Sequence, residues 1–451
     1  MNATHWSASV TKLLADLPPI EAFPTVDEMF AFTARLAEEH PDRVTLREVG
    51  RSRDGDAIEL LSIRPLESRV SVLVVGQPHP NEPIGMATIT TMCERLLADQ
   101  EELDSIGASW HFLPCVDPDG TRLNEGWFAG PWTRSHYARN FYRPGGAAQV
   151  EWTFPFSTEG FSVDAPMPET VAMMAAIDEV RPSVSASLHN GELGGAYFYA
   201  PDGADELYPQ LVALCDAHGI PLHLGGPEAP FIAELAPAIF SVPTAQQMYD
   251  MCVAFGADPA TIVSGASSLE YALQYGPVSA VVIELPYWRD DRAADLSPNS
   301  AGATRRSVVI EAADLEDQTV AKLRALYEQA SPLPPSPFGD AVDAFLRSQE
   351  AGYSEARRVE AATDPDYEQT ATVAEAFSAR DNVHMFRLRM AGMLLRAVPE
   401  DDPAHAAVEA LFTEWCREAE GDGAAKPIPI RDLVAVQGGA ILATVQHSLS
   451  Y

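Results

Sequence analysis

The sequence predicts an α/β fold: a mixed, largely parallel sheet flanked by helices, with an added helical region at the C-terminal end. Two observations point to it. Short apolar runs alternate with helical patterns through the first two-thirds of the chain, and only helical patterns follow residue 330. A run that is apolar on both faces indicates a strand covered by helices on each side, because both of its faces must be shielded from water.

The elements follow in order along the chain. Thr25 and Glu28 have the spacing of a capping box and start a helix expected over residues 26–39. Two β-like runs, 44–49 and 57–63, flank a turn and predict a hairpin at a sheet edge. Four further apolar runs predict buried strands, at 70–75, 110–113, 184–188 and 280–285. Helices are expected between them, notably over 84–97 and 170–180.

A proline-rich stretch at residues 331–337 marks a domain boundary, because proline can continue neither a helix nor a sheet ladder. We therefore expect a catalytic domain over residues 1–330 and a helical C-terminal region over residues 331–451. The helical patterns of this region lie at 341–351, 370–397, 403–420 and 431–447. Their apolar stripes predict packing against the sheet domain, and the alternative that they form a homo-oligomer interface stays open.

Composition limits the partners. Of the 451 residues, 46% are hydrophobic, and 65 acidic against 30 basic side chains give a formal net charge of −35. The chain is thus apolar enough to build a full core, and its negative charge repels phosphate backbones and anionic lipids. We expect neither nucleic acid nor a membrane surface as a partner.

Cysteine usage and the N-terminal residues indicate the compartment. The five cysteines are scattered and lack the close spacings of a disulfide framework or a zinc-thiolate site, which predicts reduced thiols. No stretch resembles a signal-peptide core or a membrane span. The prediction is a cytoplasmic protein.

Two histidines have an acidic residue three positions later: His79 with Glu82, and His189 with Glu192. The spacing alone is weak, because acidic residues are frequent in this chain. However, each histidine directly follows a predicted buried strand, and Glu284 ends a third one. Ligand sites in open α/β sheets lie at that edge, and imidazole with carboxylate is a zinc ligand set. These side chains are therefore candidates for one metal site.

The order of motifs resembles the M14 family of zinc metallocarboxypeptidases over residues 25–330. It rests on the ordered set of pieces and not on any single one. The pieces are Glu39-His40-Pro41, Val49-Gly50-Arg51-Ser52, His79-Pro80-Asn81-Glu82-Pro83, Asp117-Pro118-Asp119-Gly120, Arg139-Asn140-Phe141, Ser187-Leu188-His189, Ser264-Gly265-Ala266-Ser267 and Ile283-Glu284-Leu285.

The resemblance implies a zinc ion (Zn2+) held by His79, Glu82 and His189, with Glu284 as the general base. Carboxypeptidase A is itself a standard example of such a His2Glu site, so this ligand set is borrowed from the family. The implied reaction is hydrolysis of a C-terminal peptide (amide) bond by metal-activated water. Glu192 is the weaker rival of Glu82 as the carboxylate ligand.

The resemblance also implies two arginine roles. Arg134 matches the family arginine that stabilises the tetrahedral oxyanion, and Arg122 competes for that role. Arg139, with Asn140, matches the motif that binds the terminal carboxylate. Ala138 stands where the family usually has asparagine.

The remaining substrate residues are less clearly marked. Because the asparagine is replaced, Arg143 is expected to help bind the carboxylate. Leu269 falls near the position that lines the pocket for the terminal side chain, which would favour an apolar or aromatic residue there. The family's mobile tyrosine has no evident counterpart.

The expected substrate is a small peptide or an amino-acid conjugate. A small-molecule amidohydrolase or N-deacylase of the aspartoacylase type stays open as an alternative, because it also uses His-x-x-Glu with a later histidine. A third alternative is a catalytically inactive scaffold whose helical region binds a protein partner.

Overall fold

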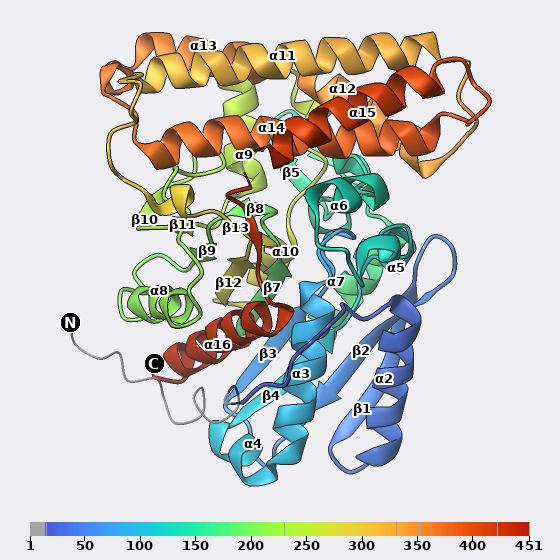
Figure 1. The fold of residues 1–451 in the computed structure, drawn as a ribbon. Coiled ribbons are helices and arrows are strands. Elements are labelled where there is room, and N and C mark those ends of the chain that lie inside the picture. Colours follow the sequence, from blue (N-terminus) through green and yellow to red (C-terminus); the bar gives the residue numbers. More distant parts are fainter. Residues whose placement is uncertain are drawn as a thin grey trace.

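The computed structural model describes residues 14 and 16–450, except residues 230, 331, 351–352 and 422. Its centre is a nine-stranded mixed sheet with the order β1-β2-β4-β3-β7-β12-β9-β11-β10. Helices lie on both faces of this sheet, and a further group of helices covers one end of it (Figure 1). The predicted fold class is confirmed.

The predicted strands are all present. The hairpin of β1 (Val44–Arg51) and β2 (Ala57–Ile63) is antiparallel and forms one edge of the sheet, as expected. Next to it, four strands run parallel to each other. They are β4 (Ala108–Leu113), β3 (Val70–Val75), β7 (Val184–His189) and β12 (Ser279–Glu284).

The far side of the sheet was not predicted. There β9 (Tyr197–Ala200) runs antiparallel to β12, and β11 (Ile239–Ser241) and β10 (Glu234–Ala236) complete the edge. These strands are only three or four residues long, too short to leave a clear apolar period in the sequence.

Helices shield both faces of the central strands. On β3, Val72 and Val74 belong to the core that includes α3 (Ile84–Ala98), whereas Leu73 and Val75 pack on the side of α7 (Pro168–Val180). All four side chains are at most 1% exposed. This alternation explains why the strand reads as one continuous apolar run in the sequence.

The other helices and strands connect this framework. The helices are α2 (Val26–Glu39), α4 (Gln100–Ile106), α5 (Pro118–Arg122), α6 (Arg134–Asn140), α8 (Tyr208–Ala217), α9 (Ala245–Ala254) and α10 (Ser268–Ala272). Small sheets are formed by β5 (Phe156–Thr158) with β6 (Phe161–Val163), and by β8 (Leu193–Gly194), β13 (Trp288–Arg289) and β14 (Lys426–Pro427). The capping box of Thr25 and Glu28 at the start of α2 is present, as predicted.

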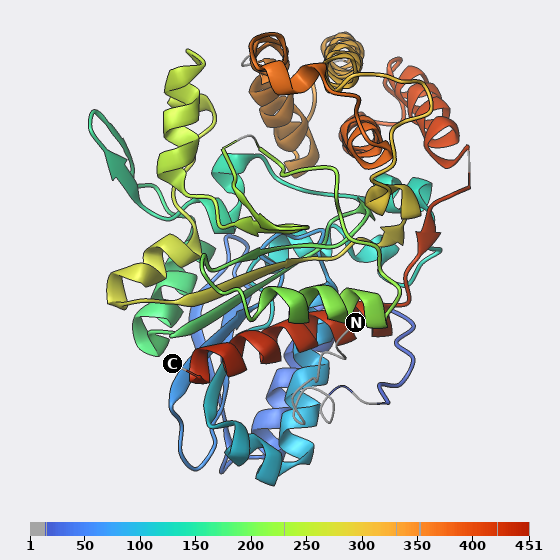
Figure 2. The same cartoon turned by 90° about the vertical axis from the view of Figure 1, so that its left-hand side faces the viewer.

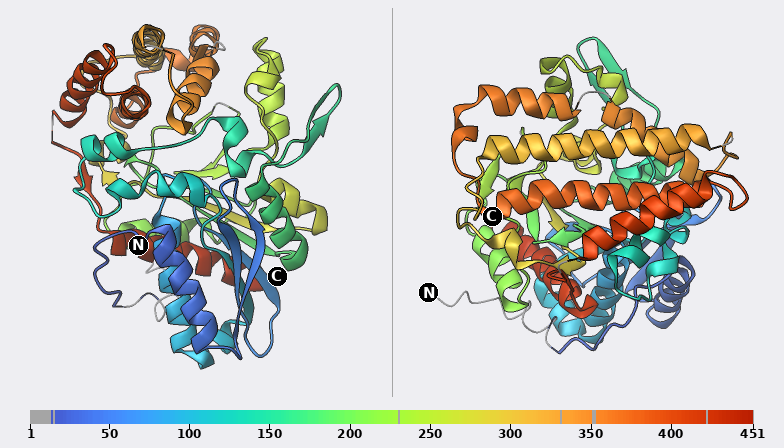
Figure 3. Two further views of the ribbon diagram at one scale, coloured as in Figure 1. Left: turned by 90° about the vertical axis from the view of Figure 1, so that its right-hand side faces the viewer. Right: turned by 45° about the horizontal axis from the view of Figure 1, so that its top comes forward.

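The C-terminal part of the chain contributes to two regions of the fold, a group of helices at one end of the sheet and a last helix on the sheet itself. Five helices form the group that covers the sheet end (Figure 2). They are α11 (Arg305–Gln329), α12 (Pro337–Glu350), α13 (Tyr353–Thr363), α14 (Val373–Ala397) and α15 (His405–Glu420). The last helix, α16 (Ile430–Leu449), returns to the sheet and packs beside α3 and α8 (Figures 1 and 3). The division at residue 330 stays a prediction.

A buried amide ties α16 to the sheet. Gln437, which is fully buried, donates from Nε2 to the backbone oxygen of His189 at 3.0 Å and accepts from Thr88 Oγ1 at 2.8 Å.

Within the described residues, no helix is long and apolar enough to cross a membrane.

Helix α14 of the helical group packs closely against helix α6. Gly392 of α14 lies on the backbone of Ala138, so that a Cβ at position 392 would overlap the Ala138 carbonyl oxygen. Ala138 itself is fully buried. The absence of a side chain at residue 392 is therefore what allows α14 to lie this close.

We expect Gly392→Ala to lower the free energy of unfolding by about 1–3 kcal/mol, because the clash is with backbone and not with a side chain that can turn away. The matched control is Gly339→Ala in α12, where an added Cβ meets nothing closer than 3.4 Å. Urea denaturation measures both. A Gly392→Ala protein as stable as the Gly339→Ala protein would contradict the packing described.

Candidate metal centre and catalytic cavity

Three side chains converge at the carboxyl ends of β3 and β7. His79 and Glu82 follow β3, and His189 is the last residue of β7. One ligand atom from each of these residues lies within 4.8 Å of the others, and all three side chains are buried. Among the described residues, this is the cluster with the donor types and spacing of a metal site.

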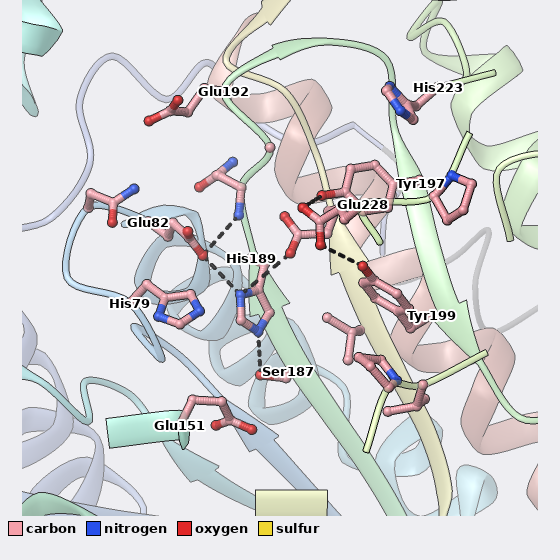
Figure 4. Close-up of a pocket in the computed structure, with 18 of the residues that line it drawn as sticks. His79, Glu82, Glu151, Ser187, His189, Glu192, Tyr197, Tyr199, His223 and Glu228 are labelled. Carbon is pink, nitrogen blue, oxygen red and sulfur yellow. Dashed lines mark hydrogen bonds and ion pairs between the residues drawn. The ribbon is translucent and has the colours of Figure 1, made fainter. Parts of the chain in front are cut away.

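Hydrogen bonds fix the imidazole of His189. Its Nδ1 lies 3.0 Å from Glu82 Oε2, and its Nε2 lies 2.8 Å from Ser187 Oγ (Figure 4). Ser187 is two residues earlier on β7, so it points to the same face of the sheet. A hydrogen bond on the second ring nitrogen orients a histidine for metal binding with the first.

His79 carries the clearest sign of a missing partner. Its Nδ1 is buried and has no hydrogen-bond partner in the described structure. Burial, together with the positive charge of nearby Arg143, holds the pKa of His79 well below its usual value, so the ring is neutral. A neutral imidazole with an unpartnered buried nitrogen fits a divalent cation, and so does the neighbouring carboxylate of Glu82.

Glu284 lies opposite this cluster because of strand register. Its Cα pairs directly with that of His189 across the parallel β7–β12 ladder. The Glu284 Oε1 atom is 3.7 Å from His189 Nδ1. Burial raises the pKa of Glu284, the charges of Glu82 and Glu228 raise it further, and His189 opposes them. A carboxyl with a raised pKa beside a metal site can both take up and release a proton near neutral pH.

These residues face one cavity of about 480 Å³. Opposite the metal ligands, the carboxylate of Glu228 accepts hydrogen bonds from Tyr197 Oη at 2.7 Å and Tyr199 Oη at 2.6 Å (Figure 4). Both tyrosines come from β9 and point to the same side of it, because they are two residues apart. Sequence reasoning missed these residues; the alternation Tyr-Phe-Tyr was the available signal.

Glu151 is a second acid that the sequence did not reveal. It is 6% exposed, and its Oε1 accepts a hydrogen bond from Ser268 Oγ at 2.7 Å. Its Oε2 is buried without a partner in the described structure, and the residue lines the cavity. Burial raises the pKa of this carboxyl. The residue lies between apolar neighbours in the sequence, which was its only signal.

The structure places some of the predicted substrate-binding residues in the cavity and others outside it. Arg143 and Leu269 line the cavity. Arg143 donates from Nη1 to Glu82 Oε1 at 2.9 Å, so it lies directly beside the metal cluster. Glu192, the rival of Glu82, also lines the cavity but lies outside the metal cluster.

Arg134, Arg139 and Asn140 do not line the cavity. Arg139 forms an ion pair with Glu409 at 2.6 Å, and Asn140 donates to the His136 backbone oxygen within α6. Arg134 is buried, and its positive charge opposes the rise in the pKa of Asp381 that burial causes. All three residues belong to α6, where Arg139 faces Glu409 of α15 and Asn140 bonds within the helix, so that neither of these two side chains is directed at the metal cluster.

Arg122, the alternative to Arg134 for stabilising the oxyanion, has other partners in the structure. It bridges Asp27 and Asp56, each at 2.8 Å, and does not line the cavity. The guanidinium beside the metal cluster is therefore that of Arg143.

Comparisons with known proteins find similarity to zinc carboxypeptidases. A family model described as zinc carboxypeptidase matches residues 29–223. The chain is 28% identical over 150 residues to zinc carboxypeptidase A 1 of Anopheles gambiae, covering 32% of this chain and 34% of the relative. It is 24% identical over 224 residues to carboxypeptidase D of Anas platyrhynchos, covering 44% of this chain and 15% of the relative. The chain thus spans about a third or less of these relatives.

Among solved structures, carboxypeptidase A from Helicoverpa armigera is similar with a TM-score of 0.37 and 17% identity. That match covers 62% of this chain and 71% of the other.

We expect His189→Ala and Glu82→Gln to weaken zinc binding more than about 100-fold, because each removes one of three protein ligands, and the loss of a residue that only hydrogen-bonds to a ligand already costs about 10- to 100-fold. Zinc retained after dialysis, measured by plasma mass spectrometry, tests this. Glu192→Gln is the control and should keep its zinc. Equal retention by all three variants would contradict the assignment of the cluster.

Proposed function

We propose that this chain, whose residues 29–223 match a family model described as zinc carboxypeptidase, hydrolyses the C-terminal amide bond of a short peptide or amino-acid conjugate. The observation that carries this proposal is the placement of Glu284 beside the cluster of His79, Glu82 and His189 in one cavity. These three residues would hold the zinc ion.

Zinc bound there would polarise the scissile carbonyl and make water acidic enough to be deprotonated near neutral pH. Glu284 takes the role of the general base: its carboxylate accepts the proton of the attacking water. The same carboxyl then returns the proton to the leaving amine. The raised pKa of Glu284, caused mainly by burial, suits this double task, because a base is most effective when its pKa lies near the working pH.

Arg143 is the residue that we assign to the oxyanion, in place of Arg134. Its guanidinium lies next to Glu82, where the carbonyl oxygen of a bound substrate would develop negative charge. Its Nη2 is 3.4 Å from Gln149 Oε1, which holds the side chain in place. A fixed cation at this position stabilises the tetrahedral state more than the planar substrate.

The shape of the cavity supports a small substrate. Its volume of about 480 Å³ is within the range of small-molecule sites, and it is closed on one side by the helical group. All five cysteines are buried and unpaired, which supports our proposal that the protein works in the cytoplasm.

Glu284→Gln should lower kcat about 10²- to 10⁴-fold toward an N-benzoyl dipeptide, because the amide is isosteric but cannot accept the proton. Its zinc content and thermal unfolding should match those of the wild type. Hydrolysis measured by release of the amino acid tests this. Unchanged kcat in a zinc-loaded Glu284→Gln protein would exclude Glu284 as the base.

Removal of the metal gives the broader test. Phenanthroline should abolish hydrolysis of N-benzoyl dipeptides, and added zinc should restore it. N-acetylated single amino acids distinguish the N-deacylase alternative, for which they would be the better substrates. Activity that survives the chelator would overturn the proposed function.

A further inference from the structure

The helical group supplies one wall of the catalytic cavity through a single helix, α14. The α14 residues that line the cavity recur at helical spacing and therefore share one face of the helix. They are Phe377, Ser378, Asp381, Asn382, Met385 and Arg389. The helical group is thus part of the substrate site.

The contact of Gly392 with Ala138 shows which part of the expected carboxylate-binding motif helix α14 covers. Ala138 is the position at which the resemblance would place a carboxylate-binding asparagine, and in this chain α14 covers it completely. The neighbouring Arg139 points out to Glu409. Position 138 and Arg139 of the expected carboxylate motif therefore lie outside the cavity, which α14 lines instead, whereas the expected helper Arg143 does line it.

The cavity offers two arginines and, among the described lining residues, no lysine. Arg143, which we assign to the oxyanion, has both terminal nitrogens engaged, Nη1 by Glu82 and Nη2 by Gln149. Arg389 forms one ion pair, from Nη1 to Glu192 Oε2 at 3.2 Å. Its side chain is 25% exposed, and within the described part of the chain Glu192 is the acid that pairs with it. A guanidinium has five N–H donors, so the other edge of Arg389 is left for a ligand.

Arg389 is also held in a fixed orientation. Its guanidinium carbon lies 5.6 Å from the centre of the Phe141 ring. Its partner Glu192 accepts a hydrogen bond from Tyr137 Oη at 2.5 Å, and that hydroxyl lies 3.4 Å from Asn81 Nδ2. Asn81 directly precedes Glu82, so this chain of contacts ties Arg389 to the metal cluster. Preorganisation of this kind reduces the entropy lost when a ligand binds.

We propose that Arg389 binds the terminal carboxylate of the substrate, so that the appended helix α14 provides the group that makes the enzyme an exopeptidase. The inference rests on the proposed function for the identity of the substrate. A planar guanidinium pairs with a carboxylate through two parallel hydrogen bonds, which a C-terminal amide cannot accept in the same way. In a cavity with several acids, such a fixed cation is needed for an anionic group to enter.

The test compares the binding of a peptide acid with that of its C-terminal amide. The protein is the zinc-loaded Glu284→Gln variant, in which the peptide is not consumed, and the probe is an N-benzoyl dipeptide in both forms. Calorimetry should give the acid a Kd at least about 10-fold lower than the amide. Adding Arg389→Met should remove most of this ratio by weakening the acid and leaving the amide nearly unchanged.

Arg139→Met is the matched control. Arg139 also pairs with a glutamate and lies over an aromatic ring, 4.8 Å from the centre of Phe412, but it does so outside the cavity. This variant should keep the full acid-to-amide ratio. Arg389→Lys keeps a charge without the planar fork and should retain only part of the ratio, which provides a second variant should Arg389→Met fold poorly.

An acid-to-amide ratio that survives Arg389→Met, or that is lost equally in Arg139→Met, would overturn the inference. A Glu284→Gln protein that binds acid and amide equally would overturn it as well. Failure of the proposed function is separate, because it appears as absence of dipeptide hydrolysis by the wild-type zinc-loaded protein, whereas the binding comparison requires no turnover.

Discussion

The register of one parallel strand pair is the constraint on which the site depends. Because β7 and β12 pair with His189 opposite Glu284, a candidate metal ligand and a carboxyl group emerge side by side from adjacent strand ends. β3 pairs with β7 on its other side, which brings the segment with His79 and Glu82 to the same edge. A shift of β12 by one residue would turn Glu284 to the opposite face of the sheet.

The last helix, α16, supports the ends of the central strands. Gln437 of α16 donates to the backbone oxygen of His189, and it is the polar residue within the otherwise apolar, buried stretch 433–443 of the helix. Its amide satisfies a buried carbonyl at the point where the ladder ends. The end of the chain therefore stabilises the metal site from the face of the sheet opposite α7, while α14 closes the cavity above it.

Sequence reasoning succeeded where the signal is local or periodic. The continuous apolar runs identified the buried strands of the parallel centre, and the position of His79, His189 and Glu284 just at their ends led to the side chains that the fold brings together. It was less successful with the arginines. The motif around Arg139 suggested a role in the site, but residues 134–140 form a helix that directs Arg139 outward. That outcome depends on the packing of α14, which is distant in sequence and has no short motif.

The same reason explains the missed residues. Tyr197 and Tyr199 lie on a four-residue strand, and Glu151 lies in a three-residue 3-10 helix. Arg389 belongs to the long helix α14, whose sequence pattern shows mainly the apolar residues that pack in the core. Each becomes recognisable only through its neighbours in space. An acid buried with an unpartnered oxygen or an arginine with one edge unpaired is a property of the folded cavity.

The most direct test of the central claim is the anomalous scattering of zinc in a crystal of the zinc-loaded protein. We expect one strong peak about 2 Å from ligand atoms of His79, Glu82 and His189, with the carboxyl group of Glu284 facing it. A peak at any other group of residues, with Glu82 still bound to Arg143, His189 and the backbone N–H of Asn190, would contradict this.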